Sequence, residues 1–252
     1  MSSVTYEVVR GVAWVTLNEP DNKNALNARI LNGIGDGIAR GVADDAVRAI
    51  VLTHEGNTFC AGADLKGAGP FEEARYSFPD VLCAMQDSPK PVVAKIAGHV
   101  MGGGNGLAAA ADISIASTDV NFGFTEVRIG VAPAMISVVC MPKLSKADAA
   151  ELFLTGRKVP AARIAEMGMI NRAVEPGELD KAVEELLGEL CAAGPNALAE
   201  SKKLLRGIPE MTREQGFEHT QVLSAALFKS PEAAEGIAAF RERRPAAWVP
   251  VD

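Results

Sequence analysis

The sequence predicts an α/β fold with stacked, mostly parallel sheets and a helical C-terminal region. In the first half of the chain, short strand-like apolar segments alternate with segments whose apolar residues repeat at helical spacing, which is typical of β–α–β crossovers. Beyond residue 144 nearly every apolar pattern is helical. The composition, 48% hydrophobic and 23% charged over 252 residues, is that of an ordinary globular protein and excludes disorder and coiled coil.

The first half begins with a predicted β-hairpin. Residues 5–9 and 12–17 have strand-like patterns and are joined by an Arg10-Gly11 turn. A helix follows, because apolar side chains recur at Ile30, Leu31, Ile34, Ile38 and Val42. The other elements predicted here are strands at 48–53, 91–96 and 112–116, and helices at 78–85 and 103–110.

The second half is predicted to be helical. The helices expected are 146–154, 161–167, 179–190, 197–205, 213–228 and 231–243, with one strand at 170–174. Glycine and proline mark the joints between them. We expect one structural unit, with an α/β core over residues 1–195 and a helical region over residues 196–252 that packs on the core or on a neighbouring subunit.

Charge and cysteine content restrict the class of protein. The net charge of −7 argues against a general nucleic-acid binder, which needs a basic surface. The cluster Arg241, Arg243 and Arg244 is either a local phosphate-binding patch or a solvated helix end. The four cysteines have no CxxC spacing, the N-terminus lacks an apolar signal segment, and the longest charge-free stretch is too short and glycine-rich to span a membrane. We therefore expect a cytoplasmic protein with reduced thiols.

Two glycine-containing loops, at residues 59–66 and 97–107, each follow a predicted strand. Small residues before a helix leave backbone N–H groups open to a ligand, although tight strand–helix turns would need the same residues. Residues 104–109 also fit the dinucleotide pattern G-x-G-x-x-A. That match is weak, because about seven residues separate the predicted strand end at Ile96 from Gly104.

Five segments in order along the chain point to a known family. They are Asn24-Ala25-Leu26-Asn27; Ala61-Gly62-Ala63-Asp64-Leu65-Lys66; Gly102-Gly103-Gly104 with Leu107 and Asp112; Phe122-Gly123-Phe124-Thr125-Glu126; and Glu235-Gly236 with Phe240-Arg241-Glu242-Arg243. In order and spacing they resemble the motifs of the enoyl-CoA hydratase/isomerase (crotonase) superfamily. The resemblance covers nearly the whole chain.

The resemblance implies a crotonase-like stacked ββα core and chemistry on acyl-coenzyme A thioesters through an enolate-like intermediate. The backbone N–H groups of Ala63 and Gly103 would form the oxyanion hole for the thioester oxygen. No cofactor is implied beyond the coenzyme A of the substrate, and no metal, nucleic acid or membrane. The assembly implied is a homotrimer or a dimer of trimers, in which the C-terminal helices form the interface. The residues implied in coenzyme A binding are Ala25, Leu26, Ala61, Asp64, Leu65 and Lys66, with Phe240 and Arg243 from the same or a neighbouring subunit.

The chain departs from the family at one catalytic position. Many hydratases of the family use two glutamates to hold a water, and the second of these matches Glu126. The first falls at Gly106, so that carboxylate is missing. Glu126 could instead pair with Arg128 or Lys143. Side chains that could replace the missing acid, or have only structural roles, are His99, Asn105, Glu72, Glu73 and Asp80.

Four functions remain open from the sequence. The leading expectation is an enoyl-CoA hydratase, because most relatives with this overall pattern carry that name. A double-bond isomerase is the first alternative, since one carboxylate can move a proton between two carbons. An acyl-CoA-binding protein that has lost its chemistry is the second. The nicotinamide or flavin enzyme suggested by the weak fingerprint is a distant fourth reading.

Overall fold

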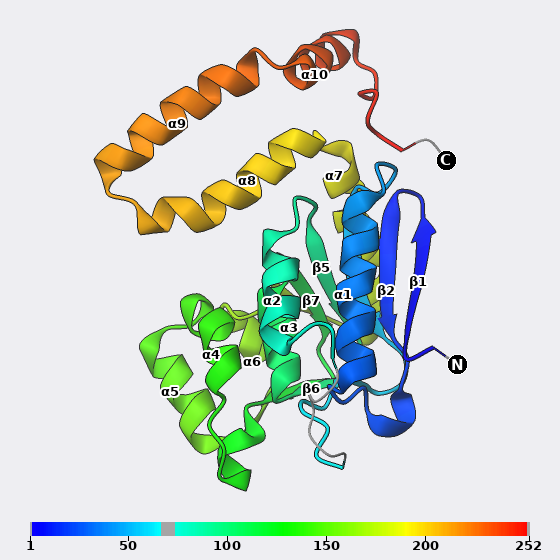
Figure 1. The fold of residues 1–252 in the computed structure, drawn as a ribbon, viewed down its shortest axis with the longest axis vertical. Coiled ribbons are helices and arrows are strands. Elements are labelled where there is room, and N and C mark those ends of the chain that lie inside the picture. The colour runs from blue at the N-terminus through cyan, green and yellow to red at the C-terminus, as the bar shows by residue number, and fades with distance from the viewer. Residues whose placement is uncertain (1, 67–73, 251–252) are drawn as a thin grey trace.

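The computed structural model describes residues 2–66 and 74–250. Its larger sheet has six strands in the order β1-β2-β3-β5-β7-β10, in which β1 pairs antiparallel with β2 and every other pair is parallel (Figure 1). The bounds are β1 Val4–Val9, β2 Val12–Leu17, β3 Ala49–His54, β5 Val92–Ile96, β7 Ile113–Ser117 and β10 Arg172–Val174. The predicted hairpin, strands and parallel arrangement are thus confirmed, with ends shifted by one or two residues.

The stacked sheets predicted from the sequence include a second, smaller sheet, whose strands were not predicted individually. It contains β4 (Thr58–Cys60), β6 (His99–Met101), β8 (Asn121–Gly123) and β9 (Lys158–Pro160), in that order. Each strand has only three residues, which is too short for an alternating pattern to stand out. Strands β4 and β6 lead directly into the two glycine loops, so this sheet places the loops side by side.

The helices match the predicted ones, with one addition. Helix α4 was missed because Pro133 and the adjoining apolar run gave no clear period. The bounds are α1 Ala28–Ala43, α2 Phe78–Asp87, α3 Gly103–Ala110, α4 Ala134–Cys140, α5 Lys146–Thr155, α6 Ala161–Glu166, α7 Leu179–Ala192, α8 Pro195–Gly207, α9 Arg213–Phe228 and α10 Pro231–Glu242. Short 3₁₀ helices η1 to η5 occupy Pro20–Asn22, Thr125–Ile129, Met141–Lys143, Pro176–Glu178 and Ile208–Glu210.

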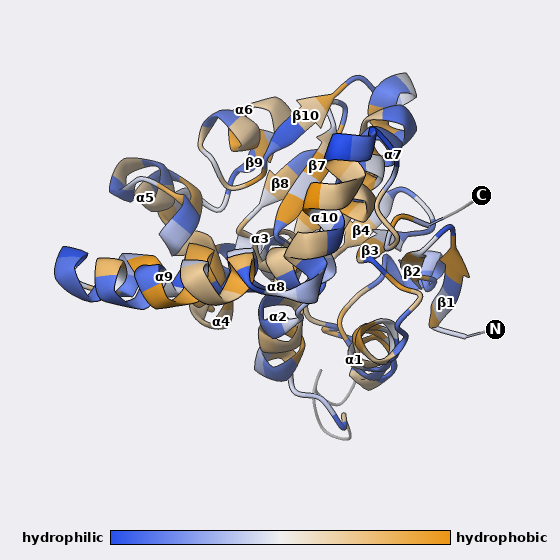
Figure 2. Cartoon of the chain, turned by 90° about the horizontal axis from the view of Figure 1, so that it is seen from above, coloured by the Kyte–Doolittle hydropathy of each residue, from blue (hydrophilic) through white to orange (hydrophobic). Residues whose placement is uncertain are grey.

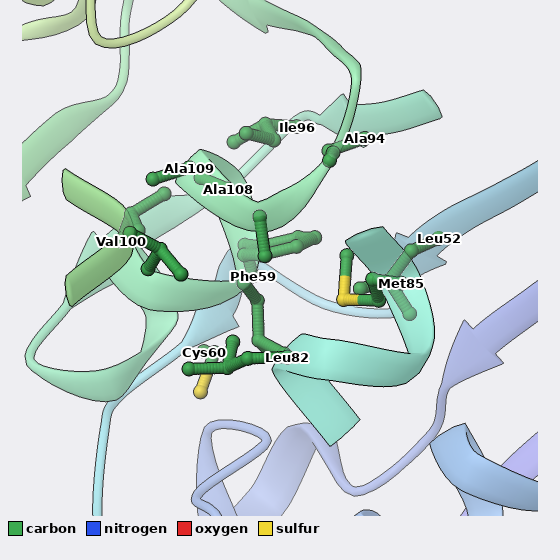
Figure 3. Packing of buried hydrophobic residues seen from close by; sticks show 14 of the residues in the cluster. Leu52, Phe59, Cys60, Leu82, Met85, Ala94, Ile96, Val100, Ala108 and Ala109 are labelled. Atoms are coloured by element: carbon green, nitrogen blue, oxygen red, sulfur yellow. The ribbon is translucent and has the colours of Figure 1, made fainter. Parts of the chain in front are cut away.

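The larger sheet is covered on both faces. On one face, α1, α2 and α3 pack over the sheet and form the main core, in which Phe59 and Met85 are fully buried (Figure 3). On the other face, Leu179, Val183 and Leu187 of α7 pack against strand residues. Burial of both faces explains why the central parallel strands are almost continuously apolar.

The C-terminal helices extend beyond the sheets at one end of the molecule (Figures 1 and 2). Helix α8 is attached to the core by Lys202, whose buried ammonium donates to the carboxylate of Asp112 at 2.6 Å and to the carbonyl of Lys90 at 3.0 Å. Asp112 also accepts from the N–H of Val92, so its role is structural. The division of the chain near residue 195 stays a prediction.

Candidate active site

A cavity of about 490 Å³ lies where the two glycine loops meet η2 and α4. One wall consists of Leu26, residues of the 61–65 loop, and the Gly102-Gly103 pair. The other consists of residues from the 125–136 segment, with Phe78 of α2 between the walls. Most of the lining is apolar, which suits a hydrocarbon chain and strengthens any electrostatic interaction inside it.

The cavity contains the two backbone amides expected to form an oxyanion hole. Ala63 and Gly103 both line it, and none of the loop or turn hydrogen bonds among the described residues uses either N–H. Gly103 is the first residue of α3, where N–H groups lack an intrahelical acceptor and the helix dipole favours negative charge. Two free donors in an apolar cavity are therefore able to stabilise an enolate oxygen.

The backbone at both amides depends on glycine. Gly102 has φ +52° and ψ −124°, a backbone conformation that residues other than glycine rarely adopt. Gly62 has φ +86°, and a Cβ at that position would lie 3.1 Å from the nitrogen of Gly103. The two loops therefore touch through bare backbone, which brings the amides of residues 63 and 103 to one cavity.

The Asn24-Ala25-Leu26-Asn27 motif holds the first loop in place. The N–H of Leu26 donates to the Gly62 carbonyl at 2.7 Å, and the Leu26 carbonyl accepts from the N–H of Asp64 at 3.1 Å. The fully buried Asn24 side chain donates to the carbonyls of Glu55 and Thr58. The motif thus forms a short parallel bridge on either side of Ala63.

Glu126 supplies the only carboxylate among the described residues that line the cavity. Its Oε2 atom is buried without a hydrogen-bond partner. Burial raises the pKa of Glu126 above its ordinary value of 4.5, and a hydrogen bond with its own backbone N–H offsets this only in part. Lys143 donates instead to the Ala111 carbonyl, and Arg128 forms no ion pair with Glu126. The ion-paired alternative for Glu126 is therefore wrong.

The position of the missing acid is filled by hydrocarbon. A Cβ atom at position 106 would lie 2.7 Å from Cγ2 of Ile136 and 3.1 Å from Cζ of Phe78. A glutamate there would require both side chains to move. A Cβ atom added at Gly104 would lie 2.7 Å from the carbonyl oxygen of Cys60. Residues 104–106 are therefore packed inside the protein and form no groove for a pyrophosphate. The dinucleotide interpretation therefore has no support.

Three of the five side chains considered as substitutes for the missing acid have structural roles. His99 accepts from the N–H of Asn121 through Nδ1, and Asp80 forms the capping box of α2 with Ser77. The Asn105 amide donates to the carbonyls of Gly102 and Gly123, at 3.0 and 2.9 Å. Glu72 and Glu73 lie outside the described residues.

The residues expected to bind coenzyme A divide into three groups. Leu26, Ala61 and Leu65 line the cavity, whereas Ala25, Asp64 and Lys66 adjoin it in sequence without lining it. Asp64 accepts hydrogen bonds from Asn22 and from the N–H of Lys66, which lower its pKa. Phe240 and Arg243, in and just after α10, do not line this cavity, and Phe240 is 84% exposed.

The sequence interpretation missed the second wall of the cavity. Arg128, Met135 and Ile136 all line it, and the last two belong to the unpredicted helix α4. The run of apolar residues at 134–140 was the available signal in the sequence.

Within residues 2–66 and 74–250, no three His, Cys, Asp or Glu side chains are grouped to hold a metal ion. In the same residues no helix has the length and apolar character needed to cross a membrane.

Known proteins share both the sequence and the fold. The profile of the enoyl-CoA hydratase/isomerase family matches residues 7–250. A Thermus thermophilus relative, named as a candidate enoyl-CoA hydratase, is 34% identical over 242 residues, covering 93% of this chain and 96% of its own. Carnitinyl-CoA dehydratase of Proteus mirabilis is 32% identical over 258 residues, covering 98% and 99%. The crystal structure of an enoyl-CoA hydratase from Mycobacterium smegmatis matches with a TM-score of 0.88 at 29% identity, over 98% of both chains.

These matches extend over almost the full length of the chain, and they agree with the five motifs and the two stacked sheets. The chain therefore belongs to the enoyl-CoA hydratase/isomerase (crotonase) family and is an enzyme of that family.

Proposed function

We propose that this enzyme hydrates 2-enoyl-CoA thioesters, with Glu126 as its single acid–base group. The observation that carries the proposal is the half-buried Glu126 carboxylate in the same cavity as the unused amides of Ala63 and Gly103. The names of the relatives, a candidate hydratase and a dehydratase, support addition and removal of water.

One carboxylate is enough to balance this reaction. Glu126 takes a proton from water as the water oxygen bonds to C3 of the enoyl group. The electron pair of the C2–C3 double bond moves toward the thioester, and the resulting enolate oxygen accepts from the N–H groups of Ala63 and Gly103. Protonated Glu126 then returns the proton to C2. Both new bonds form on the face that Glu126 occupies, so the addition is syn.

A double-bond isomerase is the second candidate, and the packing at Gly106 favours it. Ile136 and Phe78 occupy the space in which a second carboxylate would stand. Moving a double bond from C3–C4 to C2–C3 needs only one base, which removes a proton from C2 and delivers it to C4. The third expectation, a binding protein without chemistry, has less support, because Glu126 retains a raised pKa suited to proton transfer.

Turnover of two substrates separates these candidates. Crotonyl-CoA hydration is followed by the loss of enoyl-thioester absorbance, and 3-hexenoyl-CoA isomerisation by its gain. We expect the wild type to hydrate crotonyl-CoA faster than it isomerises 3-hexenoyl-CoA; the reverse ranking would assign the isomerase. Glu126→Gln should lower kcat about 100- to 10,000-fold, the range for loss of a general base.

The matched control is Glu185→Gln, which removes an exposed carboxylate of α7. It should retain wild-type kcat. Wild-type turnover by Glu126→Gln would overturn the role given to Glu126.

A further inference from the structure

Arg128 is an unexplained cation in the substrate cavity. Among the described residues lining the cavity it is the only basic one, and with Thr125 and Glu126 it makes up the polar side chains of a largely apolar lining. The reaction outlined above has no use for it. An acyl pocket for a plain hydrocarbon chain would have no need of a guanidinium.

Within the described part of the chain, Arg128 has no hydrogen-bond or ion-pair partner. Several other arginines are paired, among them Arg29 with Glu19 and Arg163 with Asp148. Arg172 and Arg241 also lack such a partner among the described residues, but Arg128 differs from both in lining the cavity. The stem of Arg128 lies beside Gly156, the residue that caps the C-terminus of α5, where an added Cβ would come 3.1 Å from Cγ of Arg128. Arg128 thus lines the cavity while being exposed to solvent, so its guanidinium is open to a ligand.

Local geometry separates Arg128 from Glu126. Both belong to η2, and a 3₁₀ helix has three residues per turn, so side chains two residues apart point in different directions. In agreement with this, the raised pKa of Glu126 reflects burial, with no opposing effect of a cation. Arg128 is therefore free to act on a group other than the catalytic carboxylate.

The two walls of the cavity indicate which part of the substrate Arg128 faces. The thioester oxygen is assigned to the amides of Ala63 and Gly103 on the first wall, next to the loop expected to hold coenzyme A. Arg128 belongs to the second wall, with residues of α4. Relative to the thioester, this is the side of the acyl chain. This step rests on the proposed function, which fixes how the thioester lies.

We propose that Arg128 is a specificity-determining residue that selects acyl-CoA substrates with a second carboxylate on the acyl chain. A guanidinium binds a carboxylate through two parallel, charge-assisted hydrogen bonds. In a chain of net charge −7, a local cation favours the binding of an additional anion at that place. The substrate class is the monothioester of an unsaturated dicarboxylic acid.

The test compares two 2-enoyl thioesters that differ in a terminal carboxylate, crotonyl-CoA and glutaconyl-CoA. The wild type should have the higher kcat/KM for glutaconyl-CoA. In Arg128→Gln, the ratio of kcat/KM for glutaconyl-CoA to that for crotonyl-CoA should fall about 10- to 100-fold, mainly through KM, because one charge-assisted contact is lost. Arg128→Lys should restore part of the ratio. The control is Arg157→Gln, an arginine that pairs with Glu151 outside the cavity, and its ratio should equal that of the wild type.

Two kinetic outcomes would overturn the inference. An unchanged ratio in Arg128→Gln means that the acyl carboxylate does not contact Arg128. An equal loss on both substrates means that Arg128 binds the phosphates of coenzyme A or supports the fold. Calorimetry with glutaryl-CoA and butyryl-CoA, which are saturated and cannot be hydrated, gives the same comparison without turnover. The wild type could bind glutaryl-CoA more tightly than butyryl-CoA, lose that preference in Arg128→Gln, and yet hydrate neither enoyl thioester. That result would refute the proposed hydratase function but support the role of Arg128 in specificity.

Discussion

At the scale of single residues, the burial of Glu126 lowers the stability of the fold but suits the side chain to act as a catalytic base. Its Oε2 atom is buried without a partner, so the charged form is less stable in the native protein than in water. The same burial raises the pKa of Glu126 and makes it a stronger base near neutral pH. Stability and activity therefore respond to this side chain in opposite directions.

The first prediction concerns the pH dependence of stability. Because the pKa of Glu126 is higher in the folded than in the unfolded state, its contribution to the free energy of unfolding is fully present below about pH 4.5. That contribution is lost as the pH rises through the folded-state pKa. Replacement by Gln removes the loss, so the Gln variant should gain stability over the wild type as the pH rises above about 4.5.

Urea denaturation at several pH values measures this difference. Glu185→Gln, at an exposed position, should show a difference from the wild type that does not vary with pH. A flat difference for Glu126→Gln as well would show that burial does not raise the pKa of Glu126.

Sequence motifs predicted the residues of the site more reliably than its packing. Glu126, Ala63 and Gly103 all line one cavity, and each had been identified from a local motif. The contact of Ile136 and Phe78 with Gly106 could not be predicted, because it joins three elements that are distant in sequence. Arg128 was considered only as an ion-pair partner, since its place in the cavity wall depends on how η2 packs.

At the scale of elements, the site depends on how α3 is joined to the segment that carries Glu126. The Gly123 carbonyl at the end of β8 accepts from the N–H of Gly102 at 2.9 Å and from the Asn105 amide at 2.9 Å. The same amide donates to the Gly102 carbonyl. Asn105 is fully buried, so these bonds are shielded from water. Asn105 therefore links Gly102, which precedes the oxyanion donor Gly103, to Gly123 at the end of β8, three residues before Glu126.

We therefore expect Asn105 to be a positioning residue. Asn105→Leu keeps the approximate volume but removes both hydrogen bonds, and small misplacements of catalytic groups are costly. Its kcat for crotonyl-CoA should fall about 10- to 100-fold, with a smaller change in KM. Steady-state kinetics measure this split, and thermal unfolding reports the accompanying loss of stability.

A purely structural role is tested with Ser114→Ala. The hydroxyl of the fully buried Ser114, in β7, donates to the carbonyl of Ala108 in α3, the helix that also carries Asn105. Neither Ser114 nor Ala108 lines the cavity. This variant should lose stability while keeping kcat. If the two variants lose kcat to the same extent, Asn105 acts through general stability and the positioning role is wrong.

The long elements were predicted closely, because twelve or more residues give a clear helical period. The segments that build the site are shorter: three residues in each of β4, β6 and β8, five in η2 and seven in α4. Such segments are fixed by long-range pairing rather than by their own pattern. For this reason the sequence predicted the scaffold more completely than the walls of the cavity.

At the scale of the whole molecule, the C-terminal helices carry large apolar side chains that the described part of the chain leaves exposed. Helix α9 has 16 residues, of which only Gly216 is buried, and Phe217, Val222 and Phe228 are each at least 70% exposed. Leu205 and Phe240 are exposed to a similar degree on α8 and α10. A monomer in water rarely leaves so much apolar surface uncovered.

We predict that this surface is buried between copies of the chain in a homotrimer or a dimer of trimers. Light scattering coupled to size-exclusion chromatography should give three or six times the 26.4 kDa chain mass. The double variant Phe217→Glu with Val222→Glu should lower that mass, because charges buried at an interface oppose association. Val8→Glu, on the edge strand β1, should leave it unchanged.

Assembly would also give Phe240 and Arg243, near the C-terminus, a role in binding coenzyme A. Phe240 and Arg243 do not line the cavity of their own chain, and we predict that a neighbouring copy brings them to coenzyme A. The dissociated variant should then show a higher KM for crotonyl-CoA, with kcat changed less, because Glu126 and the two amides come from one chain. A wild-type protein that is monomeric at micromolar concentration would contradict the assembly. An unchanged KM after dissociation would instead place the coenzyme A contacts entirely within one subunit.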